Sequence, residues 1–265
     1  MHPFLRHSGP IPMVHRGAPM TKDDSLVENT EAAFQRAYDL GFRYFETDVH
    51  ATKDHVVVTS HDNSLRRVAG ERVRVDARDW TDLASVRVGG RPLPRLIDLL
   101  DVFPDVRFNV DPKADSAVRP LVDVLRSRDA LDRVCVASFS DRRLRWIRAA
   151  LGEQVCTAAG PREIRVALSQ LARGADIWIP GVDVLQVPRL LSRARVSGRA
   201  QRVDLVAGAQ RAGIPIHVWT VNDEAEMEQL IRRGVDGVMS DDVEALVRVF
   251  SRHGWQPAGH RSFPL

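Results

Sequence analysis

The sequence predicts an α/β fold in which a single (β/α)8 barrel forms one domain over residues 1–265. Short apolar runs rich in β-branched residues alternate with segments of helical periodicity along the chain, which is typical of a parallel sheet covered by helices. A length of 265 residues is usual for one such barrel. No linker, internal repeat or low-complexity segment divides the chain. We therefore expect one domain, with an N-terminal arm at residues 1–10 and a C-terminal tail at residues 255–265.

Three of the eight expected strands lie in the first half of the chain, at residues 11–14, 44–49 and 106–111, with a short extension at 56–60. Ala33, Phe34 and Ala37 lie at helical spacing after Thr30, which predicts the first helix. Further helices are expected at 80–83, 96–103 and 116–128. The rest of the stretch 65–90 is polar and predicts irregular structure.

The second half of the chain repeats the alternation of strand and helix. Strands are expected at 133–138, 154–158, 214–220 and 237–240, and one more at 175–179 or 182–186. Helices are expected between and after them, at 141–151, 162–172, 203–212, 223–233 and 242–252. The stretch 192–202 predicts a basic loop.

Charge and composition exclude some classes of function. The net charge is +3 with a pI near 9.2, and the only lysines are Lys22, Lys53 and Lys113. The many arginines are scattered rather than clustered with aromatic residues, so we expect no nucleic-acid partner but a general attraction for anionic substrates. No apolar run reaches the roughly 18 residues of a membrane span, and the N-terminus lacks a signal-peptide core. A cytoplasmic protein is expected. The oligomeric state is not determined by the sequence.

The two cysteines, Cys135 and Cys156, lie in separate apolar runs. Buried thiols are the expected interpretation, because a metal site built on only two cysteines is uncommon.

Titratable residues gather where the expected strands end. His15 directly follows the run 11–14, and His61 follows the run 56–60. Glu46 and Asp48 are two residues apart on one strand, so both side chains leave the same face about 7 Å apart. Asp111 ends the strand at 106–111. Carboxylates on the inward face of a barrel need a cation or a proton, and a hard cation such as Mg²⁺ or Ca²⁺ with three oxygen ligands would satisfy them.

Several motifs together resemble the glycerophosphodiester phosphodiesterase family. In order along the chain they are His15-Arg16-Gly17, Glu28-Asn29-Thr30, Glu46-x-Asp48-Val49, Thr52-Lys53-Asp54 and His61-Asp62. Weaker echoes continue at residues 109–113, 218–222 and 234–238, so the likeness spans nearly the whole chain. The resemblance implies a TIM barrel, a divalent metal and hydrolysis of a phosphodiester.

The resemblance also implies roles for individual residues. His15 and His61 would act as base and acid, in that order or reversed. Glu46, Asp48 and Asp111 would bind the divalent cation, although Asp111 stands where a glutamate is more usual.

Further residues would hold the substrate. Arg16 and Lys113 would bind the phosphate, and Glu28 would orient His15 or Arg16 from behind, unless it caps a helix. Trp219 would pack against the glycerol moiety, or belong to the core. His50 continues the alternation of Glu46 and Asp48 but is not assigned a role.

These expectations lead to a function and two alternatives. The expected reaction converts glycerophosphodiesters to glycerol 3-phosphate and an alcohol. The first alternative is a phospholipase D-like hydrolase of lysophospholipids or sphingolipids, which would need an apolar rim at the mouth of the barrel. The second is a phosphate-binding barrel without catalysis.

Overall fold

The eight-stranded barrel is confirmed in the computed structural model, which describes residues 1–20, 27–193 and 203–258. Its sheet runs in the order β8-β7-β6-β2-β1-β11-β10-β9, with every neighbouring pair parallel. The strands are β1 (Ile11–His15), β2 (Tyr44–Ala51), β6 (Arg107–Pro112), β7 (Val134–Val136), β8 (Cys156–Thr157), β9 (Leu185–Pro188), β10 (Ile216–Trp219) and β11 (Gly237–Ser240). A parallel bridge between Ala158 and Val184 joins the two ends of this sheet, so the barrel closes.

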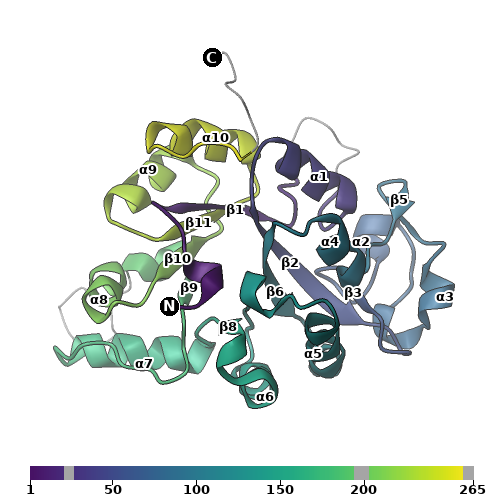
Figure 1. Cartoon of the computed structure of the whole chain (residues 1–265), viewed down its shortest axis with the longest axis horizontal. Coiled ribbons are helices and arrows are strands. Elements are labelled where there is room, and N and C mark those ends of the chain that lie inside the picture. Colours follow the sequence, from purple (N-terminus) through teal and green to yellow (C-terminus); the bar gives the residue numbers. More distant parts are fainter. Residues whose placement is uncertain (21–26, 194–202, 259–265) are drawn as a thin grey trace.

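Helices surround the sheet, and Figure 1 shows them on its outside. They are α1 (Glu31–Asp39), α4 (Leu96–Val102), α5 (Val118–Ser127), α6 (Asp141–Leu151), α7 (Pro161–Ala172), α8 (Leu205–Ala212), α9 (Glu224–Arg232) and α10 (Val243–Arg252). Several begin at the polar cap that the sequence provides: Thr30, Ser140, Asp204, Asp223 and Asp242 each accept a bond from a backbone N–H of the first turn.

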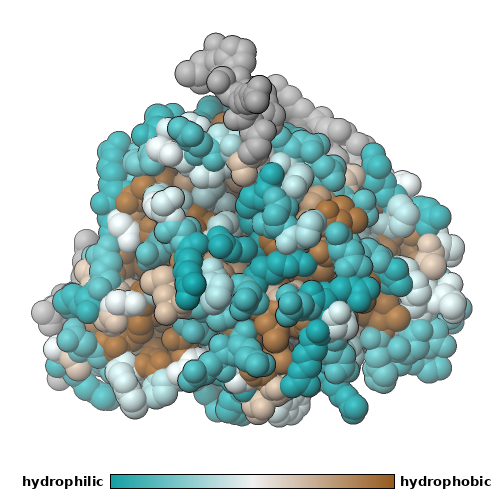
Figure 2. All heavy atoms as spheres, viewed as in Figure 1, coloured by the Kyte–Doolittle hydropathy of each residue, from teal (hydrophilic) through white to brown (hydrophobic). Residues whose placement is uncertain are grey.

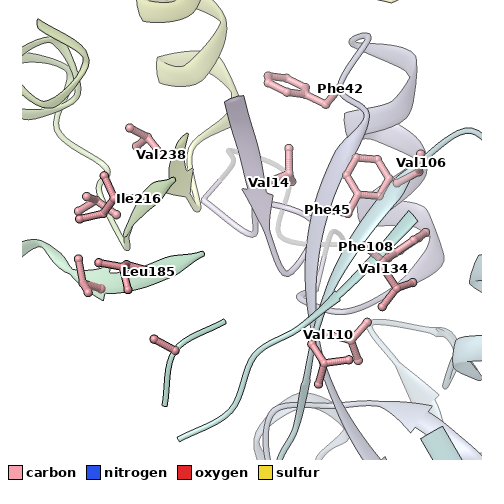
Figure 3. Close-up of a cluster of buried hydrophobic side chains, with 14 of the residues drawn as sticks. Val14, Phe42, Phe45, Val106, Phe108, Val110, Val134, Leu185, Ile216 and Val238 are labelled. Carbon is pink, nitrogen blue, oxygen red and sulfur yellow. The ribbon is translucent and has the colours of Figure 1, made fainter. Parts of the chain in front are cut away.

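The largest apolar core lies between the strands and the surrounding helices. Figure 3 shows side chains such as Val14, Phe45 and Phe108, which leave the strands toward this layer. Each is fully buried, because every second residue of a barrel strand points outward beneath a helix. The alternate residues point inward, which is how Glu46 and Asp48 come to face the inside of the barrel.

Strand register brings the polar side chains to one level. His15 of β1 lies opposite Glu46 of β2, and Asp48 of β2 lies opposite Asp111 of β6. Because parallel strands end on the same side, the residues that follow β1, β2, β6, β10 and β11 meet at the carboxyl mouth of the barrel.

The expected N-terminal arm is ordered and covers the other end of the barrel. The turn η1 (Pro3–Leu5) buries Phe4 and Leu5 among inward-facing residues of the strands. The hydroxyl of Tyr44 donates a hydrogen bond to the carbonyl of Phe4 at 3.1 Å. Cys135 and Cys156, which are free and buried as predicted, lie in the same cluster.

One expectation about local structure was wrong, and one alternative is decided. The helix expected at 80–83 is present as α3 (Trp80–Leu83), but the rest of the stretch 65–90 is not irregular. There α2 (Arg66–Ala69), η2 (Val75–Ala77) and the hairpin of β4 (Arg87–Val88) with β5 (Arg91–Pro92) enclose, with α3, a separate apolar cluster against β3 (Val57–Thr59). Its apolar residues come from short elements, so no regular period shows. Of the two ranges offered for the next strand, 182–186 overlaps β9, which begins at Leu185, whereas 175–179 is no strand and its Trp178 is exposed.

On the face shown in Figure 2, hydrophobic residues lie in separate patches between hydrophilic ones. Among the described helices, none combines the length and the apolar character that crossing a membrane requires. Lys22, most of the basic loop at 192–202 and the last residues of the tail lie outside the described residues.

Candidate active site

A cavity of about 570 Å³ opens at the carboxyl mouth of the barrel. The residues that the sequence pointed to line it together: His15, Arg16, Glu46, Asp48, His61, Asp111, Lys113 and Trp219. Glu28 is the exception and stands behind Arg16, outside this lining. The residues come from five separate segments of the chain, and barrel closure brings them to one place.

Three buried carboxylates form the floor of the cavity. Glu46, Asp48 and Asp111 have exposed fractions of 6%, 1% and 5%. Burial and the neighbouring Asp48 raise the pKa of Glu46 to about 8. Burial also raises the pKa of Asp111. For Asp48, burial acts in the same direction, but Lys113 and Arg16 outweigh it and hold its pKa below the ordinary value. The fold therefore favours the ionised form of Asp48 and the protonated forms of Glu46 and Asp111, because too little positive charge lies nearby for all three carboxylates to be ionised.

Lys113 points to the same side of β6 as Asp111 and lies between two of the carboxylates. Its Nζ is 2.6 Å from Oδ1 of Asp48 and 2.9 Å from Oδ2 of Asp111. Burial lowers the pKa of Lys113, but the attraction of Asp111 and Asp48 outweighs burial and raises it overall. The side chain is therefore a charged ammonium at neutral pH.

The floor fits a hard divalent cation in its donor chemistry. In the described residues, no three histidine, cysteine or acidic side chains form a ready-made metal cluster, since Lys113 separates Asp48 from Asp111. However, Oε2 of Glu46 and Oδ1 of Asp111 are buried and have no hydrogen-bond partner among the residues that the structure describes. Unpartnered buried carboxylate oxygens are costly, and an all-oxygen set is what Mg²⁺ or Ca²⁺ prefers.

His15 is held by a residue from the far end of the chain. Its Nδ1 lies 2.6 Å from Oδ1 of Asp241, and its Nε2 lies 3.5 Å from Oε2 of Glu46. Burial lowers the pKa of His15, but Glu46 and Asp241 outweigh burial and raise it above the ordinary value. Asp241 was not among the residues predicted for the site. The signal that could have found it is its position directly after the expected strand at 237–240.

His61, which lines the same cavity, has a comparable arrangement. Its Nδ1 lies 2.7 Å from Oδ1 of Asp62, the next residue. Its carbonyl accepts a hydrogen bond of 3.2 Å from Nε2 of His50. The ring of His50 therefore supports the backbone of His61 and does not line the cavity. Arg67, which the sequence did not single out, binds Oδ2 of Asp62 at 2.7 Å.

Arg16 reaches the floor from a strained turn. Its φ of 53° and that of Gly17, 81°, lie in the left-handed region. A side chain at Gly17 would come within 2.6 Å of Ala33 on α1, so only glycine fits there. The guanidinium Nε lies 2.8 Å from Oδ2 of Asp48, and Nη1 lies 3.7 Å from Oε1 of Glu28.

The sequence left three roles open for Glu28: orientation of His15, orientation of Arg16, or capping of a helix. It contacts Arg16 and Arg67, and the helix cap is the side chain of Thr30, which accepts a bond from the N–H of Ala33. Of the alternatives, orientation of Arg16 is thus the one with contacts in its favour.

The remaining side of the cavity is an apolar wall, which we define as Phe139, Ile164, Leu168, Leu191 and Trp219. Trp219 is half-buried at the end of β10, where it packs against the inner core cluster, and its ring meets that of Phe139 edge-on with centroids 5.5 Å apart. Phe139 is 66% exposed at the rim. The cavity therefore has one charged side and one apolar side.

Known proteins resemble this chain over nearly its whole length. Residues 15–245 match the model of the Glycerophosphoryl diester phosphodiesterase family. A probable glycerophosphodiester phosphodiesterase 2 of Mycobacterium tuberculosis is 38% identical over 261 residues, which cover 96% of each chain. A lysophospholipase D of Mus musculus is 33% identical over 248 residues, covering 81% of this chain and 79% of that protein.

Solved structures share the fold. A putative glycerophosphoryl diester phosphodiesterase from Silicibacter pomeroyi has a TM-score of 0.76 at 21% identity, covering 96% of this chain and 97% of the other. An Oleispira antarctica phosphodiesterase in complex with the product sn-glycerol-3-phosphate has a TM-score of 0.72 at 20% identity, covering 93% and 97%. The chain therefore belongs to the glycerophosphoryl diester phosphodiesterase family, a family of phosphoric diester hydrolases.

Proposed function

We propose that this protein hydrolyses glycerophosphodiesters to glycerol 3-phosphate and an alcohol, with a divalent cation and two histidines. One observation carries the proposal: His15 and His61 line the same cavity as three buried carboxylates, and each has Nδ1 bound to a carboxylate. An ionised carboxylate can only accept a hydrogen bond, so the neutral form of each ring carries its proton on Nδ1. Nε2 is then the nitrogen that can exchange a proton with the substrate.

Glu46, Asp48 and Asp111 would hold the cation, which would be Mg²⁺ or Ca²⁺. When bound, the cation would neutralise the phosphodiester and stabilise charge on the attacking and leaving oxygens. Arg16 and Lys113 carry the positive groups that line the cavity beside the carboxylates, and they would bind the remaining phosphate oxygens. Trp219 would pack against the glycerol carbons.

The proton transfers balance with the two histidines in opposite roles. We assign His15 as the base. It takes a proton either from the water that attacks phosphorus, which gives glycerol 3-phosphate directly, or from the 2-hydroxyl of the glycerol, in which case a water must then open the cyclic phosphate that forms. His61 is the acid: in its doubly protonated form it gives the proton on Nε2 to the alcohol oxygen as the bond from that oxygen to phosphorus breaks, and it becomes the neutral ring. The contact of His15 with Asp241 stabilises the imidazolium that forms, as the raised pKa of His15 indicates.

The test is a panel of glycerophosphodiesters incubated with Mg²⁺, Ca²⁺ or Mn²⁺ and coupled to detection of glycerol 3-phosphate. We expect turnover that EDTA abolishes and that an added cation restores. Full activity in metal-free protein would exclude the cation from the mechanism. Tight binding of glycerol 3-phosphate without turnover of any diester would instead favour a phosphate-binding barrel.

A second candidate function is hydrolysis of lysophospholipids or sphingolipids, and the apolar wall favours it. The sequence-based alternative required an apolar rim, and Phe139, Leu168 and Leu191 line one here. A glycerol head group leaves most of this wall without a partner, whereas a hydrocarbon chain attached to it would cover the wall beside Trp219. A relative that carries the name lysophospholipase D is 33% identical to this chain.

The measurement that separates the two functions compares glycerophosphocholine with lysophosphatidylcholine, with choline release as the common signal. If the hydrocarbon chain of the lysolipid binds along the wall, Leu168→Ser should raise KM for the lysolipid by about 10-fold, which corresponds to the free energy of burying one leucine side chain. KM for glycerophosphocholine should stay unchanged. Val166→Ser is the matched control, because Val166 is exposed on the same helix and lies outside the cavity. An equal change for both substrates would count against chain binding at the wall.

A further inference from the structure

Arg67 joins two cavity residues, Arg16 and His61, that come from separate segments of the chain. It belongs to α2, in the segment between β3 and β6 that carries its own apolar cluster. Its side chain is half-exposed and does not line the cavity. It is therefore placed to act on the site only through its neighbours.

Those neighbours are two carboxylates, each of which binds a residue of the cavity. Nη1 and Nη2 of Arg67 donate to the two oxygens of Glu28 at 2.8 and 2.7 Å. Its Nε donates to Oδ2 of Asp62 at 2.7 Å. Glu28 in turn lies 3.7 Å from Arg16, and Asp62 binds Nδ1 of His61 at 2.7 Å. The result is one continuous series of side-chain contacts that runs from Arg16 through Arg67 to His61.

This series of contacts is continuous because the side chain of Arg67 ends in a planar guanidinium. Three donors of one guanidinium serve two carboxylates at once, which the single nitrogen of a lysine cannot reproduce. Burial raises the pKa of Asp62, but the bonds from Arg67 and His61 outweigh it, and the pKa lies below its ordinary value. Asp62 is thus an anion whose second oxygen is occupied, so its first oxygen stays directed at His61.

We propose that Arg67 is a positioning residue that fixes His61 through Asp62 and Arg16 through Glu28. Without it, Asp62 would rotate into solvent, and His61 would no longer hold its proton on Nδ1. Glu28, relieved of its bidentate partner, would draw Arg16 away from the cavity and weaken its hold on phosphate. The kinetic consequences of this proposal rest on the proposed function, whereas the state of the His61 ring does not.

The kinetic test uses Arg67→Gln and Arg67→Lys on substrates with two kinds of leaving group. For an alkyl diester, we expect Arg67→Gln to raise KM and to lower kcat by about 10-fold, the usual scale when a residue that orients a functional side chain is lost. A nitrophenyl diester needs little protonation, so its kcat should fall much less. Arg67→Lys, which keeps the charge but not the fork, should recover only part of the loss.

Arg74→Gln is the matched control. Arg74 makes a similar two-bond pair with Asp76 in the same segment but has no link to the cavity. Melting temperatures of both variants would show whether stability alone explains an effect. If Arg67→Gln behaves like Arg74→Gln, or lowers kcat equally for both leaving groups, the proposal is wrong.

A second readout is independent of turnover. Nitrogen-15 NMR of the histidine rings should show neutral His61 with its proton on Nδ1 in the parent and a mixture of both tautomers in Arg67→Gln. An unchanged tautomer would contradict the proposal even if kinetics change. A protein that hydrolyses no phosphodiester but shows the tautomer shift would overturn the proposed function and leave the role of Arg67 intact.

Discussion

Asp241 binds Nδ1 of His15 at 2.6 Å, although 226 positions separate the two residues in the sequence. The contact arises because β1 and β11 are neighbours in the sheet, with Val14 paired to Ser240. Asn222 donates to the other oxygen of Asp241 at 3.2 Å, so the carboxylate is fixed from both sides. The ring of His15 therefore has one orientation available, with Nε2 toward Glu46.

The first prediction concerns this pair. Asp241→Asn should lower kcat by about 10²-fold, the scale of a general base, because the ring loses the anion that fixes its tautomer and stabilises its charge. His15→Ala should lower it at least as much. In metal-free protein, an NMR titration should place the pKa of His15 lower in Asp241→Asn than in the parent, because Asp241 is one of the groups that raise it.

Asp242→Asn is the control for this prediction. The same substitution one residue later changes the cap of α10, a position where asparagine serves as well as aspartate. Near-parent activity in Asp241→Asn would show that His15 does not depend on the contact.

The second prediction concerns the proton given to the leaving group. His61→Ala should lower kcat by about 10²-fold or more for an alkyl diester. A nitrophenyl leaving group should largely rescue it, since nitrophenolate departs without a proton. His253→Ala serves as the control, because His253 pairs with Glu228 on the outer helices. Equal losses on both substrates would reject the acid role of His61 and favour the reversed assignment.

The third prediction concerns Asp111, which stands where the family resemblance leads us to expect a glutamate. The carboxylate of an aspartate reaches about 1.5 Å less far than that of a glutamate, which is the length of one carbon–carbon bond. Oδ1 of Asp111 is nevertheless buried and has no hydrogen-bond partner in the described structure, so it is available to a cation. Asp111→Asn should weaken cation binding and activity severely, whereas Asp111→Glu should keep substantial activity. Calorimetric metal affinity and kcat of both variants provide the measurement.

Asp115→Asn is a suitable comparison for this position. Asp115 lies four residues further along and pairs with Arg142 and Arg143 at the surface. If Asp111→Asn binds the cation like the parent, Asp111 is not a ligand and the third position lies elsewhere.

The fourth prediction concerns stability and pH. The pKa of Glu46, about 8 in the folded protein against 4.5 ordinarily, means that the native state holds this proton more tightly than the unfolded chain. The stability that this gives is complete below about pH 4.5 and is lost as the pH rises toward 8. In metal-free protein, Glu46→Gln should therefore become more stable relative to the parent as the pH rises through this window.

Melting temperatures at pH 4.5, 6 and 8 test this expectation. An added cation should reduce the loss in the parent, because it favours the ionised carboxylate. Glu71→Gln, at an exposed position, controls for the removal of a carboxylate as such. A constant difference between the parent and Glu46→Gln across the range would show that Glu46 is not the group that titrates.

The sequence by itself determined the fold class and most of the charged side of the cavity. Strand and helix periods are local properties of the chain, so the helix at 141–151 and the strand at 237–240 could be placed to the residue. The two-residue spacing of Glu46 and Asp48 also fixed a shared face, because alternation along a strand does not depend on its partners. Family resemblance supplied the roles expected of these residues.

Only the tertiary structure decided which residues hold the site together. The contacts of Asp241 with His15 and of Arg67 with Glu28 and Asp62 join segments with no common period, so no local pattern reveals them. The apolar wall is likewise assembled from the loop after β7, from α7, from η6 (Arg189–Arg193) and from the end of β10. Barrel closure brings these segments to one mouth, and it is this closure, set by packing over the whole chain, that gives the cavity an apolar side.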